Sequence, residues 1–218
     1  MSAWVISKRG DQALKDRFLK NIVSFDDVCS YCLTEPGSGS DAAALKTKAA
    51  ITNEGYSLNG SKSFISGGGF SDLYVVLCRT GDQTPNGISM VLIENGQKGL
   101  SFGKKEQKMG WKAQPTAIVQ FDNCSIPATN LVGEEGAGFK YAMEGLDGGR
   151  LNIAAASLGG AQKAYEIAKS YSKERSAFGK PISKFQSIEF KLADMATQLE
   201  ACLLYTSDAA DERSSVDL

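Results

Sequence analysis

The sequence of 218 residues contains no histidine, and this absence removes several classes of chemistry. Without imidazole there is no Ser-His or Cys-His nucleophilic catalysis, which excludes most hydrolases. The chain also lacks a charge excess, since 24 Lys and Arg stand against 25 Asp and Glu. No block of like charge could follow a phosphate backbone, and no apolar run approaches the roughly 20 residues of a membrane span. We therefore expect neither nucleic acid nor a membrane span.

Cysteine is scarce and irregularly spaced. Five cysteines form an odd set, in which only Cys29 and Cys32 make a C-x-x-C pair. A zinc site would need further ligands, and a redox pair would need a thioredoxin-like βαβ setting. The pair is therefore either two thiols packed among apolar neighbours, which we favour, or a redox pair. We expect no metal site.

The hydrophobic pattern divides the chain into helical and extended parts. Helical spacing of apolar residues predicts one amphipathic helix from Asp11 to Val23. Between about residues 50 and 132, short alternating runs are separated by turn residues such as Asn53-Glu54-Gly55 and Asn59-Gly60. This pattern predicts an antiparallel β-meander that closes into a barrel or sandwich.

Helical spacing returns after Gly136. One long helix is expected around 151–171, a break follows at "AFGKPI", and a second helix with a seven-residue apolar repeat is expected around 183–202. The two helices should pack antiparallel or join a bundle. From Tyr205 onward the repeat gives way to small and acidic residues, and we assign no function to that tail. The fold class is thus α+β.

The loop "YCLTEPGSGSDAA" has the G-x-G-x-x-A spacing of a dinucleotide-binding loop. A Rossmann loop needs a strand before it, a long helix after it and a crossover to a parallel strand. Here Pro36 directly precedes Gly37, "DAAALK" allows at most two helical turns, and a hairpin follows. We therefore disfavour a Rossmann enzyme, which would require a parallel sheet around Gly37. The residues alone leave an ordinary polar loop and a ligand-binding loop equally open.

The same loop resembles the signature of the flavin-dependent acyl-CoA dehydrogenase family. The segments "LNGSKSFISGG", "GLSFGKKEQKMGWKAQPTAIVQFDNCSIPATNLVGEEGAGF", "GLDGGRLNIAAASLGGAQ" and "ERSAFGKPISKFQSIEFKLADMAT" are similar to that family in the same order, over roughly residues 10–203. Among its members they are nearest to the isobutyryl-CoA dehydrogenase type, which acts on short branched chains.

The resemblance implies an architecture and domain boundaries. Residues 1–30 would end an N-terminal helical domain that is truncated to one helix, and 31–135 would form the middle β domain. Residues 136–204 would hold the first helices of a C-terminal helical bundle, followed by a tail of doubtful origin at 205–218. The chain is therefore expected to be a fragment.

The resemblance also implies a set of residues that bind FAD. Hydroxyl and amide donors would contact the flavin from the first loop, an aromatic residue and a hydroxyl would flank the ring from the second segment, and a third segment would reach the flavin of a neighbouring subunit. The expected cofactor-binding residues are Tyr31, Cys32, Leu33, Thr34, Gly39, Ser40, Phe64, Ile65, Ser66, Arg175, Phe178, Phe185 and Gln186. Without a homologous partner, the last four would be an ordinary helix end and loop.

The remaining expectations concern substrate and partners. Ser40 together with "DGGR", Asp147, Gly148, Gly149 and Arg150, would contact the acyl-CoA, because glycines allow close approach and guanidinium pairs with phosphate. The family's catalytic Glu would lie beyond Leu218, and neither Glu35 nor Glu174 is assigned that role.

The resemblance implies a homo-oligomer, a tetramer when intact, with electron-transfer flavoprotein as acceptor. The protein would act in the mitochondrial matrix of a eukaryote or the bacterial cytoplasm, although no targeting segment is visible. A non-catalytic module that binds flavin or acyl-CoA is the alternative function.

Overall fold

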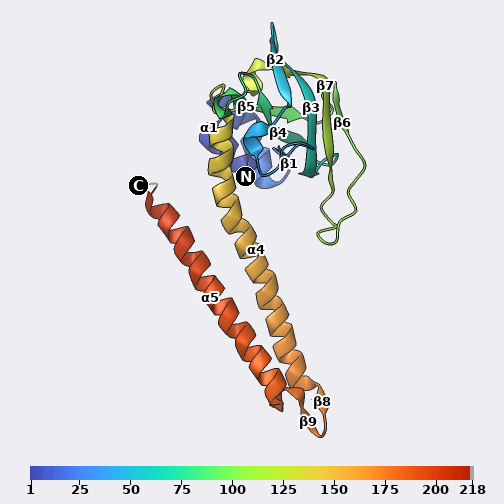
Figure 1. Ribbon diagram of the computed structural model, residues 1–218, viewed down its shortest axis with the longest axis vertical. Helices are drawn as coiled ribbons and strands as arrows, with labels where there is room; N and C mark the ends of the chain where they lie inside the picture. Colours follow the sequence, from blue (N-terminus) through green and yellow to red (C-terminus); the bar gives the residue numbers. More distant parts are fainter. Residues whose placement is uncertain (217–218) are drawn as a thin grey trace. The chain divides into compact units, whose positions relative to one another are not determined.

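The computed structural model describes the backbone of residues 1–216 and the side chains of residues 1–205. The chain divides into two compact units, Met1–Leu146 and Asp147–Leu218, and each is described by itself. Figure 1 shows a β-sheet with short helices in the first unit and two long helices in the second. No helix of the described part is long and apolar enough to cross a membrane.

The first unit begins with helical segments. Helix α1 (Ser2–Arg9) is followed by α2 (Gln12–Leu14), a π-helical turn (Lys15–Leu19) and α3 (Lys20–Ser24). The Asp11 side chain caps α2 by accepting a hydrogen bond of 2.8 Å from the Leu14 N–H. The predicted helix at 11–23 is thus present with a π turn in its middle. Helix α1 is additional to the single helix that the sequence predicted.

Seven strands form one mixed sheet, and nearly all lie in the segments whose alternation predicted them. They are β1 (Cys29–Cys32), β2 (Lys48–Thr52), β3 (Gly55–Ser66), β4 (Leu73–Arg79), β5 (Ile88–Glu94), β6 (Leu100–Phe102) and β7 (Thr116–Pro127). Their order is β1-β4-β2-β3-β7-β6, with β5 paired to β4. Single 3₁₀ turns lie at Ala42–Ala44, Pro85–Gly87 and Ala128–Asn130.

The sheet differs from a pure antiparallel meander at β1 and β2, each of which pairs with β4 in parallel. Strand β1 runs parallel to β4 from Cys29–Leu73 to Cys32–Val76, and the hairpin of β2 and β3 lies between them in the chain. The loop after β1 makes only the one 3₁₀ turn, so no Rossmann crossover is present there. Asn53 and Glu54 form the expected turn, since Thr52 pairs with Gly55. Gly60, expected in a turn, instead lies inside β3 at a register shift.

Strand β4 is buried on both faces and separates two apolar cores. Leu73, Val75 and Leu77 face the core that includes α1, α3 and the start of α4. Tyr74, Val76 and Cys78 face the core formed with β2, β3 and β7. Alternation along one strand therefore supplies side chains to both layers.

The second unit consists mainly of a helical hairpin. Helix α4 (Gly138–Glu174), whose first residues belong to the first unit, leads into β8 (Ser176–Ala177), β9 (Lys180–Pro181), a 3₁₀ turn (Ile182–Lys184) and α5 (Gln186–Val216). Helix α5 returns antiparallel to α4 and diverges from it (Figure 1). Part of the tail at 205–218 is helical, and residues 217–218 lie outside the described residues.

Candidate functional site

A cavity of about 760 Å³ in the first unit brings together two of the sequence-predicted segments. Tyr31, Leu33 and Thr34, at the end of β1, line one wall, and residues 64–66, at the end of β3, line another. The segments lie about thirty positions apart in the chain. The fold therefore assembles Tyr31, Leu33, Thr34, Phe64, Ile65 and Ser66 at one place.

Two hydrogen bonds hold these walls in register. The Ser63 N–H donates to the Thr34 carbonyl oxygen at 2.8 Å. The Ser30 hydroxyl donates to the Ser66 carbonyl oxygen at 2.6 Å. The two segments are thus tied by one hydrogen bond between backbone groups and by one from a side-chain hydroxyl to a backbone carbonyl.

Phe64 has an unusual backbone conformation and an exposed ring. Its φ is +57°, in the left-handed region that bulky residues rarely adopt, and its side chain is 68% exposed. It lies within the register shift between Lys62 and Ile65, where β3 bulges from its pairing with β7. Strain of this kind, with no local burial to offset it, is concentrated at functional sites.

The Tyr31 hydroxyl is a buried polar group without a hydrogen-bond partner among the described residues. Burial raises the pKa of this phenol well above its ordinary value, with a smaller effect from the nearby Cys32 thiol. The hydroxyl therefore stays protonated and is available as a donor. An unsatisfied buried polar atom beside a cavity is a mark of a binding surface.

Behind the first loop lies a buried ion pair between Glu35 and Lys62. The Lys62 Nζ is 2.8 Å from the Glu35 Oε1, and neither side chain is appreciably exposed. Glu35 also accepts hydrogen bonds from the backbone N–H groups of Lys46, at 2.6 Å, and Thr47, at 2.9 Å. Both carboxylate oxygens are engaged, so Glu35 is not placed to act as a base.

The pair shifts both pKa values. Burial alone would raise the pKa of Glu35, but the Lys62 charge and the hydrogen bonds to Glu35 outweigh it and hold that pKa below its ordinary value. Burial lowers the pKa of Lys62, and Glu35 opposes that effect. Glu35 is therefore a carboxylate at neutral pH.

Cys29 and Cys32 are packed thiols and not a redox pair. Cys29 and Cys32 are three apart in an extended strand, so their side chains point to opposite faces of the sheet, and each packs with a different core. Burial raises the pKa of Cys29 to about 11 and raises that of Cys32 further. Neither thiol is activated, and no redox pair can form between them.

Several predicted residues are placed elsewhere. The Cys32 side chain is fully buried in the core on the far face of β1 and does not line the cavity. Gly39 and Ser40 are exposed in the loop and also lie outside the cavity lining. A Cβ atom at Gly39 would meet nothing within 4 Å, so the described fold does not require glycine there.

The sequence suggested that the "DGGR" segment precedes the long helix, but the segment lies inside α4. Asp147 and Arg150 are exposed on that helix. Glycine in a helix interior costs about 1 kcal/mol relative to alanine, so Gly148 and Gly149 are not explained by helix stability. Their small size leaves the helix backbone open to close contact.

The third predicted segment surrounds the β8–β9 hairpin. Phe178 and Gly179 form its two-residue turn with φ of +51° and +79°. The Phe178 ring is 95% exposed and makes an edge contact with Phe185 at 6.2 Å between centroids. The exposed Arg175 and Gln186 flank the hairpin. Phe178 and Phe185 are thus brought together at an exposed tip.

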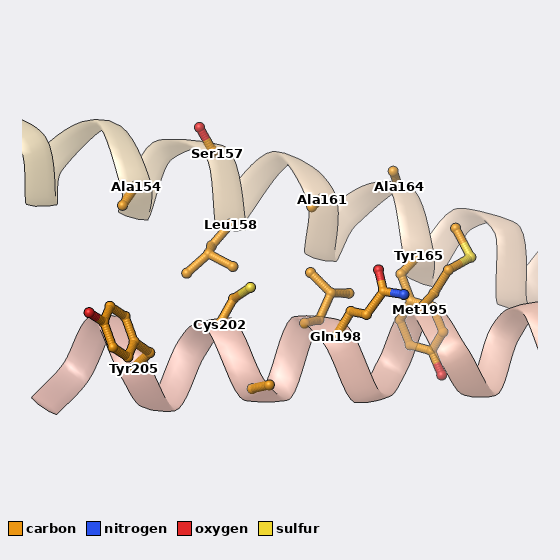
Figure 2. A pocket seen from close by; sticks show the side chains of 12 residues that line it. Ala154, Ser157, Leu158, Ala161, Ala164, Tyr165, Met195, Gln198, Cys202 and Tyr205 are labelled. Carbon is orange, nitrogen blue, oxygen red and sulfur yellow. The ribbon is translucent and has the colours of Figure 1, made fainter.

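A second concavity, of about 720 Å³, lies between α4 and α5. Figure 2 shows Leu158 from α4 and Cys202 from α5 pointing toward one another across it, with Tyr165 and Met195 farther along. Its lining is apolar except for Ser157, Gln198 and the Tyr hydroxyls. The groove is a pair of helix faces with little polar chemistry.

Sequence reasoning missed the pocket residue Ser63 and two buried cations, Lys62 behind the site and Arg79 elsewhere in the same unit. Lys62 and Arg79 are 0% and 3% exposed, although charged residues in strands are usually solvated. The one available signal for Lys62 was its place in a strand otherwise rich in buried residues. Among the described residues, no group of three His, Cys, Asp or Glu could hold a metal ion.

Comparison with known proteins decides the family. Residues 30–124 match the model of the acyl-CoA dehydrogenase middle domain, and residues 136–217 match that of the acyl-CoA dehydrogenase C-terminal domain. The chain belongs to the acyl-CoA dehydrogenase family. The resemblance inferred from the loop and its accompanying segments is thereby confirmed.

Individual members of the family show which acyl-CoA dehydrogenases this chain is similar to. It is 50% identical over 210 residues to a mitochondrial isobutyryl-CoA dehydrogenase of Bos taurus. The matched residues make up 96% of this chain and 50% of the relative. It resembles the structure of butyryl-CoA dehydrogenase from Megasphaera elsdenii with a TM-score of 0.93 at 44% identity, over 97% of this chain and 56% of the other.

A structure of PigA with FAD and proline gives a TM-score of 0.93 at 30% identity, covering 98% of this chain and 56% of the other. The fold class inferred from the sequence is confirmed by these matches. The acyl-CoA dehydrogenase chain spans about half the length of the curated relatives it matches.

Proposed function

We propose that this chain supplies the flavin- and acyl-CoA-binding part of an FAD-dependent acyl-CoA dehydrogenase. The enzyme would oxidise the α,β bond of a short branched acyl-CoA to the 2-enoyl-CoA. The main support is the meeting of Tyr31–Thr34 and Phe64–Ser66 at one cavity, tied by the hydrogen bond from Ser63 to Thr34. Family membership and the similarity to isobutyryl-CoA dehydrogenase support the reaction and the substrate class.

The residues around the cavity fit a flavin. The unpartnered Tyr31 hydroxyl and the Thr34 and Ser66 side chains supply polar contacts, while the exposed Phe64 supplies an aromatic face. FAD, when bound, accepts the hydride that leaves the substrate. The role of these residues is to orient the ring and to stabilise the charge that it gains. Gly39 and Ser40, both exposed in the loop, would approach the same ligand.

The helical residues are proposed to serve substrate and assembly. Asp147 and Arg150, beside the open backbone of Gly148 and Gly149, would contact the CoA portion of the substrate, with the guanidinium pairing with phosphate. We further propose that the middle and C-terminal domains extend over 31–135 and 136–204.

The exposed hairpin residues Arg175 and Phe178, with Phe185 and Gln186, would reach a flavin in a neighbouring subunit of a homotetramer. Further helices would cover the groove between α4 and α5. Electron-transfer flavoprotein is the proposed acceptor. The proposed compartment is the mitochondrial matrix in a eukaryote or the cytoplasm in a bacterium.

Replacing Ser66 by alanine tests the flavin assignment. A hydroxyl close to the reacting edge of the ring acts mainly as charge develops, so we expect the rate of FAD reduction by isobutyryl-CoA to fall by about 10–100-fold. The FAD content should change much less. Because the expected catalytic Glu lies beyond Leu218, the rate is measured by stopped-flow absorbance on the FAD-loaded full-length enzyme that contains this chain.

The exposed Ser125 on β7 provides the matched control. Ser125→Ala also removes a serine hydroxyl, but at a position that does not line the cavity. Equal reduction rates in Ser66→Ala and Ser125→Ala would remove Ser66 from the site.

A further inference from the structure

We propose that the buried ammonium of Lys62, with Glu35 as its counter-ion, is a positioning device that fixes both flavin-facing segments from behind the cavity. This inference rests on the proposed function and adds two residues to it. Neither Lys62 nor Glu35 lines the cavity. Both act through neighbours that do.

On the β1 side, the ammonium of Lys62 holds the two residues that flank Thr34. The Lys62 Nζ donates to the Leu33 carbonyl oxygen at 3.0 Å and to the Glu35 Oε1 at 2.8 Å. Thr34 lies between these two anchors, and its own carbonyl accepts from Ser63. The direction in which Thr34 meets the cavity is therefore set by one buried charge.

On the β3 side, Lys62 is the last paired residue before the bulge. It pairs with Val119 of β7, and regular pairing resumes only at Ile65. Because side chains alternate along a strand, moving the register by one residue would turn Phe64 and Ser66 to the other face. The buried Lys62 ammonium, held by Glu35 and Leu33, would fix the register of β3 at the bulge. The left-handed conformation of Phe64 would be kept in place with it.

The carboxylate of Glu35 completes the device by closing the loop. Its oxygens accept hydrogen bonds from the N–H groups of Lys46 and Thr47. The Glu35 carboxylate therefore ties the start of the loop, next to Thr34, to its end at Thr47. A buried ion pair is weak evidence for stability, since apolar residues of similar volume often serve as well. The geometry that this pair imposes on the cavity gives it a role beyond stability.

The test uses Lys62→Met and Glu35→Gln, with Asn130→Ala as the matched control. Asn130 is buried, bonds the Leu92 carbonyl at 2.9 Å and lies outside the cavity lining, so its loss destabilises the same unit without touching the site. Two quantities are measured on the 218-residue chain: amide hydrogen exchange without FAD, and the dissociation constant for FAD. Glu35→Gln carries the test if Lys62→Met does not fold.

We expect the Ser63 and Thr47 amides to exchange about tenfold faster or more in Lys62→Met than in Asn130→Ala, after matching for global stability. The dissociation constant for FAD should rise by about tenfold or more in Lys62→Met and stay within about twofold in Asn130→Ala.

Unchanged local exchange, or unchanged FAD affinity in Lys62→Met beside normal binding by the unmodified chain, would overturn the positioning role. Failure of the unmodified chain to bind FAD would instead contradict the proposed function.

Discussion

Replacing Arg79 by methionine is expected to lower the free energy of unfolding of the first unit by about 3–5 kcal/mol. The buried guanidinium donates from Nε to the Leu45 carbonyl at 3.2 Å and from Nη2 to the Ala43 carbonyl at 2.7 Å. Its Nη1 donates to the carbonyls of Thr84, at 3.0 Å, and Asp82. Methionine fills similar space but supplies no donor, so four backbone acceptors lose their partner.

Urea unfolding followed by intrinsic fluorescence measures this loss. The control is Arg17→Met, because the Arg17 side chain is 45% exposed, its ion pair with Glu94 is solvated, and among the described residues its only other hydrogen bond goes to the Asn130 Oδ1 at 3.1 Å. An exposed pair of this kind contributes about 0–1 kcal/mol. If the two variants lost equal stability, the Arg79 guanidinium would not be joining residues 43–45 to residues 82–84 through these four hydrogen bonds.

The Glu35→Gln variant is expected to be less stable than the unmodified chain by about 3 kcal/mol at pH 7, because it leaves a buried ammonium with a neutral partner. This difference should shrink in acid. The pKa of Glu35 is lower in the folded chain than its ordinary value of 4.5. Its carboxylate therefore contributes stability above about pH 4.5, and that contribution is lost as the pH falls through the lowered pKa.

Urea unfolding of both proteins between pH 7 and pH 3 measures the difference. The exposed Glu94 provides the matched control, since Glu94→Gln breaks only the solvated pair with Arg17. We expect that variant to stay within about 1 kcal/mol of the unmodified chain at every pH. A stability difference for Glu35→Gln that grew toward low pH would contradict the assigned ionisation of the pair.

Local patterns predicted most of the strands and helices. Alternation predicted β3 and β7, because a half-buried strand presents apolar side chains with a period of two. Strands β4 and β5 are buried on both faces, and they were predicted as short apolar runs between turn residues. The parallel pairing of β1 with β4 was not predictable in this way. It depends on the hairpin of β2 and β3 lying between them in the chain, which is a property of the topology.

The site was predictable only in part, and for a physical reason. Thr34 and Ser66 were identified from the family resemblance of their segments, since hydroxyls in loops have no distinctive period. Lys62 was missed because a charged residue in a strand is usually solvated, and its burial depends on Glu35, which is 27 positions away. Partners so distant in sequence become visible only in the folded chain.

The central claim is that Tyr31–Thr34 and Phe64–Ser66 together form a flavin site. The most direct test is titration of the ¹⁵N-labelled 218-residue chain with FAD, following backbone amide resonances. We predict saturable binding, with the largest shifts at Thr34, Phe64 and Ser66 and little change at Asn53 or Asn95 in turns outside the cavity lining. The absence of saturable binding, or shifts confined to residues away from this cavity, would contradict the account.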